Sequence, residues 1–223
     1  MTTEVPIIAG TTLDPVAYGF AKSLAHPGGN ITGFVTDAGI EGLTKHIELL
    51  REAVPHAKRI GWLAPTDSWK ARYGQQMKGA AERAGVRLVG PGLDSPIVEE
   101  EYRRVLNEMA KARVDGVIVG LVVDNSAHGP LIAKVIAELS IPAIFPDRSS
   151  VDVGGLMAYT IDFVEHNRRI PAYIDRILKG EKPGDLPFQQ PSRWLFIVNL
   201  NAAKALGITM PESLLALADE IIE

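Results

Sequence analysis

Short apolar runs alternate with amphipathic segments through the middle of the chain, and this alternation constrains the fold more than any other feature. The runs RIGWLA, VRLV, GVIV and PAIF, which begin at residues 59, 86, 116 and 142, have the length and composition of buried strands. The segments between them carry apolar residues at helical spacing, and Trp69, Tyr73 and Met77 predict one helix over 68–84. Because each connection is too long for a hairpin, we expect parallel strands joined by right-handed crossovers. Residues 57–147 therefore predict a doubly wound α/β sheet.

The two ends of the chain carry similar segments but no complete sheet. Val5–Ala9 predicts a strand and residues 14–25 a helix, while a helix ending in ILKG, a proline-rich connector and a final strand follow residue 160. Each of these segments has an apolar face that needs a cover, so we expect them to associate. The sequence thus predicts an incomplete lobe one, formed by residues 1–36 and 161–223 together with the hinge segments. It predicts a complete lobe two, formed by residues 37–160.

Composition excludes several classes of function. The 223 residues hold 23 Lys and Arg against 27 Asp and Glu, a net charge of -4, which is not the footprint of a nucleic-acid-binding protein. There is no cysteine, so disulfides, thiolate metal sites and cysteine nucleophiles are excluded. The first residues, MTTEVPIIAG, lack the basic and long apolar regions of a signal peptide, so the sequence as written carries no export signal.

Polar side chains collect directly after the predicted strands. In an open parallel sheet, ligands bind beyond the carboxyl ends of the strands, so these corners are the candidate site. Carboxylates there suit an ammonium, an arginine suits a carboxylate, and an aromatic ring suits an apolar side chain. The predicted ligand is a small zwitterion or polyol, and the candidate ligand-binding residues are Thr11, Thr12, Asp14, Thr66, Ser68, Asp124, Asn125, Asp147, Arg148 and Tyr159.

Each candidate also has a purely structural interpretation. Asp14, Asp67, Ser68 and Ser126 are suitable helix N-caps, and an N-cap alone explains such a residue before a helix. The pair Asp124–Asn125 suits an Asx turn. Arg148 suits an ion pair in a loop, and Tyr159 suits half-buried packing. Both interpretations stay open on the sequence alone.

Motifs of the common catalytic and cofactor sites are missing. The sequence has no G-x-S-x-G, no phosphate-binding P-loop, no G-x-G-x-x-G and no H-E-x-x-H. The five histidines lie far apart without metal-ligand spacing, so neither a metal nor another cofactor is implied. Only His128, near the Asp124 loop, is a candidate base. These observations favour a binding protein over an enzyme.

Four stretches resemble a known family, in the same order and over essentially the whole chain. They are DPVAYGFAKSLAHPGGNITGF, GGLMAYTIDF, YIDRILKGEKPGDLPFQQP and NLNAAKALGITMPESLLALADEIIE. They are similar to bacterial ABC transporter substrate-binding proteins of the tryptophan/tyrosine type. The resemblance implies a type I periplasmic binding protein fold, a small-molecule solute such as an amino acid captured in the cleft between two lobes, and an ABC permease as partner. It also implies a location in the periplasm or on a lipid anchor. The alternative expectation is a location in the cytoplasm, because the sequence as written carries no export signal.

The resemblance assigns positions and exposes two departures. The family's Asp-Pro corner falls on Asp14–Pro15, its lobe-two pair on Asp124–Asn125, its Gly-Gly crossover on Gly154–Gly155, and its aromatic position on Tyr159. Pro171 stands where the family usually has alanine, so we expect the helix there to start late or kink. The family also has strand–helix units before the stretch that begins here. We therefore expect a fragment of a longer protein, with a truncated protein as the alternative.

Two other functions remain open on the sequence. A cytoplasmic ligand-sensing module shares the same fold, and a helix-turn-helix segment, which is not visible in the sequence, would distinguish it. An α/β enzyme is the second, and it requires a nucleophile placed beside His128.

Overall fold

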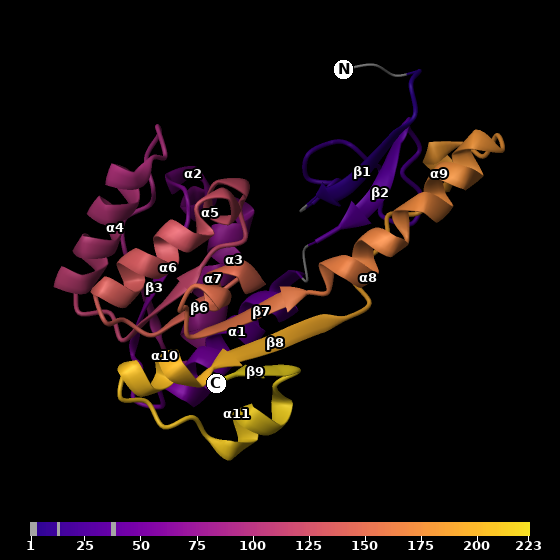
Figure 1. Ribbon diagram of the computed structural model, residues 1–223. Coiled ribbons are helices and arrows are strands. Elements are labelled where there is room, and N and C mark those ends of the chain that lie inside the picture. The colour runs from indigo at the N-terminus through magenta and orange to yellow at the C-terminus, as the bar shows by residue number, and fades with distance from the viewer. Residues whose placement is uncertain (1–3, 13, 37–38) are drawn as a thin grey trace. The chain divides into compact units, whose positions relative to one another are not determined.

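The computed structural model describes residues 4–12, 14–36 and 39–223, and these residues form two compact units (Figure 1). Unit 1 comprises Met1–Gly39 and Ile161–Trp194, and unit 2 comprises Ile40–Thr160 and Leu195–Glu223. The chain therefore passes from one unit to the other three times. The last 29 positions differ from expectation, because we expected all of 161–223 to join the N-terminal segment.

Unit 2 is built on a seven-stranded sheet with the order β4-β3-β5-β6-β7-β8-β9. The first five strands in this order pair in parallel, as the alternating pattern predicts. Figure 1 shows β7 and β8 running in opposite directions. The strands are β3 Arg59–Leu63, β4 Arg87–Val89, β5 Gly116–Val119, β6 Ala143–Phe145, β7 Met157–Ile161, β8 Trp194–Asn199 and β9 Glu220–Ile222.

Helices cover both faces of this sheet, which makes unit 2 the doubly wound lobe that the sequence predicts. On one face of the sheet, Ile47 and Met77 from the helices form a core with Trp62 of β3. On the opposite face, Tyr102 and Ile132 belong to a second core. The helices of unit 2 are α1 Gly39–Ala53, α2 Thr66–Lys70, α3 Arg72–Arg83, α4 Glu99–Lys111, α5 Val123–Ala127, α6 Gly129–Glu138, α7 Arg148–Asp152, α10 Leu200–Ala205 and α11 Glu212–Leu217.

The helical face of α4 illustrates why these segments fold as they do. Tyr102, Val105, Leu106 and Met109 follow the spacing i, i+3, i+4 and i+7 and are all fully buried. Burying each side chain of this size stabilises the fold by about 1.5–3 kcal/mol. Three glutamates in the first turn complement the positive amino end of the helix dipole. The local pattern and the packing therefore agree.

The segment predicted as one helix over 68–84 is two helices, α2 and α3, separated at Ala71. Ala71 has an extended backbone (φ -68, ψ 169), which ends α2 and precedes α3. The two helices then pack so closely that a Cβ at Gly74 would lie 2.4 Å from the Ser68 carbonyl oxygen. The prediction of a continuous helix was wrong because the glycine permits this close approach, which spacing alone does not reveal.

Unit 1 holds a two-stranded parallel sheet of β1 Ile7–Thr12 and β2 Ile31–Val35, with Ile7 opposite Ile31. Helices α8 Phe163–Arg168 and α9 Ile170–Leu178 follow β7, and the 3₁₀ turn η1 Pro183–Asp185 lies in the proline-rich connector. A small core joins Phe34 of β2 to Tyr173 and Leu186. The connector is ordered against the sheet, because Gln189 forms a parallel bridge with Phe34.

Two local predictions in unit 1 have different outcomes. The helix expected over 14–25 is wrong: the Asp14 side chain begins a single turn, and Gly19, with φ +72, ends it. The Phe20 amide donates to the Pro15 carbonyl oxygen at 2.8 Å, the closing bond of a glycine-terminated turn. The break expected near Pro171 is confirmed, since α8 ends at Arg168 and Pro171 lies in the first turn of α9.

A search of the described residues for helices that are long and apolar enough to cross a membrane finds none.

Candidate functional site

The carboxyl ends of β3 and β5 lie side by side, because Leu63 and Val119 are register partners at the end of each strand. The corners that follow these strands therefore meet at one edge of the unit 2 sheet, where the sequence predicts the site. Asn125 joins the two corners. Its amide nitrogen donates to the carbonyl oxygens of Leu63 and Gly120, each at 2.9 Å, and its amide oxygen accepts from the Tyr102 hydroxyl at 3.1 Å.

These three bonds occupy the Asn125 side chain, which is 1% exposed. A buried amide whose two N–H groups and whose oxygen all have protein partners is a structural element of the edge, which favours the structural interpretation for this residue. Its neighbour Asp124 differs, because it is exposed and its carboxylate makes no hydrogen bond or ion pair with any described residue. The Asp124 backbone carbonyl accepts from Nδ1 of His128 at 2.8 Å.

Asp124 also influences a buried hydroxyl nearby. Burial raises the pKa of Tyr102 far above its ordinary value, and the negative charge of Asp124 raises it further. Tyr102 is therefore a permanent hydrogen-bond donor to Asn125 at every physiological pH. The His128 ring lies 5.2 Å from the Tyr102 ring, so the one candidate base packs against this network.

The corner after β3 contributes two hydroxyls. Thr66 donates through Oγ1 to the Asp94 carboxylate at 2.7 Å, while its backbone amide donates to the Leu93 carbonyl oxygen. Ser68 is half-buried, and its hydroxyl has no partner among the described residues. The N-cap of α2 is Pro65 and that of α5 is Val122, so the prediction that Asp67, Ser68 and Ser126 cap helices was wrong.

Asp147 and Arg148, which follow β6, are engaged within unit 2. The Asp147 carboxylate is the N-cap of α7, accepting from the Ser150 amide at 2.9 Å and from the Ser149 hydroxyl at 2.6 Å. Arg148 forms a two-bond ion pair with Glu220 and a third contact with Asp152 at 3.3 Å. The ion pair lowers the pKa of Glu220 and raises that of Arg148.

Tyr159 lies in the middle of β7 and packs against a histidine. Its ring meets that of His46 edge to face, with the centroids 5.5 Å apart. Burial raises the pKa of Tyr159, and Asp219 adds to the effect. Burial lowers the pKa of His46, whose Nδ1 donates to the Gly42 carbonyl oxygen at 2.7 Å. The chain passes to unit 1 at the end of β7, six residues after Gly155 of the predicted crossover.

The remaining candidates lie in unit 1. Thr11 is in β1, and its side chain falls outside the described part of the structure. Thr12 ends β1, and its carbonyl oxygen accepts from the Thr36 amide at 2.8 Å. The Asp14 carboxylate accepts from the amides of Val16 and Ala17 at 3.1 and 2.9 Å, which is the capping role that the sequence allows.

An aromatic cluster beside the β3 corner was not among the predicted site residues. Trp69 of α2 lies 4.9 Å from Trp62 of β3, and Tyr73 lies 6.0 Å from Trp62. The indole nitrogen of Trp69 is buried and has no hydrogen-bond partner among the described residues. The helical spacing of Trp69 and Tyr73 indicated core packing, and only the unpaired donor distinguishes the cluster from ordinary core.

No cluster of metal-ligating residues is found among the residues that the structure describes. At the edge formed by β3 and β5, the groups available to a solute are the Asp124 carboxylate, the Ser68 hydroxyl and the partly buried rings of Trp69 and Tyr73. Such a set suits the ammonium, the polar atoms and the side chain of an amino acid.

Comparison with known proteins decides the family. The sequence model of the family described as ABC transporter substrate binding protein matches residues 1–222. The chain belongs to the ABC transporter substrate-binding protein family. That description is of a solute-binding protein and not of an enzyme, and it agrees with the resemblance in the sequence.

Relatives of this substrate-binding protein share both sequence and fold. A tyrosine-binding protein of Clostridioides difficile (strain R20291) is 27% identical over 211 residues, which are 93% of this chain and 58% of that protein. The chain therefore spans less than two thirds of the length of this curated relative. The solved ABC domain from Streptococcus pneumoniae in complex with L-Trp is 28% identical, with a TM-score of 0.86 over 99% of this chain and 75% of that one.

A conserved domain protein from Vibrio cholerae has the same fold. It is 24% identical with a TM-score of 0.88, over 99% of this chain and 72% of that chain. The α/β fold predicted from the alternating pattern is thus the fold of these two solved structures.

Proposed function

We propose that this chain is the solute-binding component of an ABC import system, which captures an aromatic amino acid and delivers it to a membrane permease. The family supports the binding role. The names of two relatives, one a tyrosine-binding protein and one solved with L-Trp, support the class of solute.

One observation within the chain carries the proposal. The Asp124 carboxylate is exposed and unpaired among the described residues, at a strand edge shared with the Ser68 hydroxyl and the Trp62–Trp69–Tyr73 cluster. An unpaired carboxylate at this edge binds the ammonium of an amino acid in a charge-assisted bond. The aromatic cluster accounts for a preference for solutes with large rings.

The ten candidate residues fall into three proposed groups. Asp124, Ser68 and Thr66 are proposed to contact the solute directly, because their polar groups are exposed or half-buried at the strand ends. Asn125, Asp147, Arg148 and Tyr159 are proposed to hold that edge in shape through the bonds already described. Thr11, Thr12 and Asp14 are proposed to act from unit 1, which we equate with part of lobe one, while unit 2 is equated with lobe two.

We also propose that the protein is exported and works in the periplasm or on a lipid anchor, beside its permease. The family is the support for this location. Fractionation of cells that express the full-length gene tests it: recovery of the protein with the cytoplasm would overturn this part of the proposal.

Calorimetric titration with L-Trp, L-Tyr and N-acetyl-L-Trp tests the solute and the role of Asp124 together. The wild type is expected to bind the two amino acids and to bind the N-acetyl compound, which lacks the ammonium, at least about tenfold more weakly. In Asp124→Asn, this discrimination should shrink to less than about threefold. Glu100→Gln removes an exposed carboxylate on α4 and is the matched control, with the wild-type discrimination expected.

A further inference from the structure

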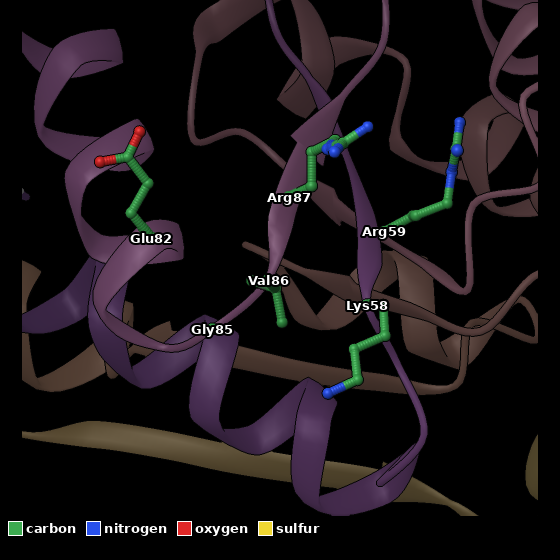
Figure 2. Close-up of a pocket in the computed structure, with 6 residues that line it drawn as sticks. All are labelled: Lys58, Arg59, Glu82, Gly85, Val86 and Arg87. Carbon is green, nitrogen blue, oxygen red and sulfur yellow. The ribbon is translucent and has the colours of Figure 1, made fainter.

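A basic groove lies at the amino ends of β3 and β4, at the edge of the unit 2 sheet opposite the candidate solute site. It has a volume of about 600 Å³ and is open to solvent (Figure 2). Its lining consists of Lys58, Arg59, Glu82, Gly85, Val86 and Arg87. Three of these six residues are cations and one is an anion, in a chain whose net charge is negative.

The cations of the groove come from adjacent strands, and none of them has an ion-pair partner among the described residues. Arg59 and Arg87 are register partners on adjacent parallel strands, a position where like charges repel. Neither arginine nor Lys58 forms an ion pair with any described residue, and Nε of Arg59 is buried without a hydrogen-bond partner. The Asp115 carboxylate accepts from the backbone amides of Lys58 and Arg59 at 2.7 and 2.8 Å and forms no ion pair with their side chains.

The positive charge extends along the same sheet edge beyond the groove. The segments that lead into β3, β4 and β5, residues 51–59, 82–87 and 111–116, contain seven Lys and Arg against three Asp and Glu. Cations in the last turn of a helix, such as Arg51 and Arg83, are explained by the negative end of the helix dipole. The three groove cations lie outside the helices, so the dipole does not explain them.

We propose that this basic edge of unit 2 docks on a membrane surface that carries anionic phospholipid. Figure 2 shows the side chains of Arg59 and Arg87 extending toward the upper right and that of Lys58 toward the lower left. Side chains that diverge in this way fit an array of separate phosphates better than a single small anion. Guanidinium groups match phosphate oxygens with paired hydrogen bonds, and each basic residue near an anionic bilayer strengthens the attraction.

The proposal is independent of the solute, because its residues lie at the other edge of the sheet. It differs from nucleic-acid binding, since a net charge of -4 does not favour a long polyanion that runs beyond this edge. Within unit 2, a flat bilayer can meet the basic edge without facing the carboxyl edge. Docking there leaves the carboxyl edge, with Ser68 and Asp124, turned away from the lipid.

Co-sedimentation with lipid vesicles tests the proposal. The wild type is expected to bind vesicles with about 30% phosphatidylglycerol and not vesicles of phosphatidylcholine alone, with binding lost at high salt. Lys58 and Arg87 are both exposed, so Lys58→Gln/Arg87→Gln is the main variant. Its partition coefficient should fall by about 25-fold, or fivefold for each cation removed. The exposed pair Lys70→Gln/Lys134→Gln is the matched control, expected to stay within about twofold of the wild type.

The melting temperature of each variant separates lost docking from lost folding. A second variant, Arg59→Lys, keeps the charge and is expected to retain most of the binding even if it lowers stability. Equal binding by the main variant and the control would overturn the proposal. Full release from vesicles by inorganic phosphate at matched ionic strength would also overturn it, since that result assigns the groove to a small anion. Retention on an immobilised polyglutamate peptide without vesicle binding would assign the edge to an acidic protein instead.

Discussion

The amide nitrogen of Asn125 lies 2.9 Å from the carbonyl oxygen of Leu63, a residue 62 positions earlier in the chain. This bond fixes the corner after β5 to the end of β3, and with the Gly120 and Tyr102 bonds it shapes the edge where we propose that solute binds. Asn125→Ala leaves these buried partners unsatisfied, so the free energy of unfolding should fall by about 3 kcal/mol. Urea unfolding measures the loss. The exposed Asn201→Ala on α10 is the control and should change stability by less than about 0.5 kcal/mol.

The close approach of α2 and α3 predicts opposite effects for two glycines of the same helix. A Cβ at Gly74 would meet the carbonyl oxygens of Ser68 and Trp69 at 2.4 and 2.5 Å, so Gly74→Ala should destabilise unit 2 by about 1–3 kcal/mol. At Gly79 the nearest atom is the end of the flexible Arg83 side chain, at 3.3 Å. Gly79→Ala should therefore stabilise by about 0.5–1 kcal/mol. Thermal unfolding of both variants checks the contrast, and a loss at both sites would refute the packing argument.

Buried His166 predicts that stability falls on acidification. Its ring is fully buried, Nε2 donates to the Gly10 carbonyl oxygen at 3.2 Å, and Nδ1 has no partner among the described residues. Burial lowers the pKa of His166, and the charge of Arg169 adds to this, against opposing effects of the Gly10 bond and Glu165. The unfolded chain therefore takes up a proton before the folded chain does. This contribution to stability is complete above about pH 6.5 and is lost as the pH falls below it.

Urea unfolding at neutral pH and at about pH 5.5 measures this dependence. His166→Gln keeps a donor for the Gly10 carbonyl oxygen. It should reduce the dependence of the free energy of unfolding on pH, recovering about 1 kcal/mol of the stability lost in acid. The exposed His56→Gln is the matched control, in which the wild-type slope should persist. The pKa of His46 is also lowered, so part of the slope should remain in His166→Gln. An unchanged slope in that variant would show that His166 does not contribute.

The Arg148–Glu220 ion pair is expected to contribute little to stability. The two side chains are 49% and 41% exposed, so solvent screens their attraction. A double-mutant cycle with Arg148→Gln and Glu220→Gln should give a coupling energy of about 0.5 kcal/mol, which falls in high salt. Arg148 lowers the pKa of Glu220, so the contribution is present above the ordinary carboxyl range and is lost as the pH falls through it. A coupling of several kcal/mol would indicate a larger role than the exposure allows.

The sequence predicted the architecture of unit 2 because strand and helix periods alternate in it without interruption. The buried face of α4 and the parallel pairing of β3 with β5 follow from that pattern. The single turn after Asp14 was not predicted from the sequence. The apolar residues at 20, 21 and 24 have the spacing of a helical face, but Gly19 ends the turn before them. Strands β8 and β9 join the sheet of unit 2 by pairing with its strands, and this pairing depends on contacts between residues far apart in the sequence. A local sequence pattern does not encode such contacts.

The meeting of the corners was predictable from the sequence, but the bonds that each corner residue makes were not. The corners after β3 and β5 do share one edge, as parallel strands require. That Asn125 is used internally depends on Leu63 and Tyr102, which lie far from it in sequence. The basic groove was missed for the same reason, since its cations come from separate segments and become neighbours only through the register of β3 with β4.

Titration of this chain with L-Trp and L-Tyr in a calorimeter tests the central claim most directly. The account predicts saturable binding to a single site, with affinity reduced by about 10- to 100-fold in Asp124→Asn and unchanged in Glu100→Gln. Absence of heat and of any shift in melting temperature with either amino acid would contradict it, as would wild-type affinity in Asp124→Asn.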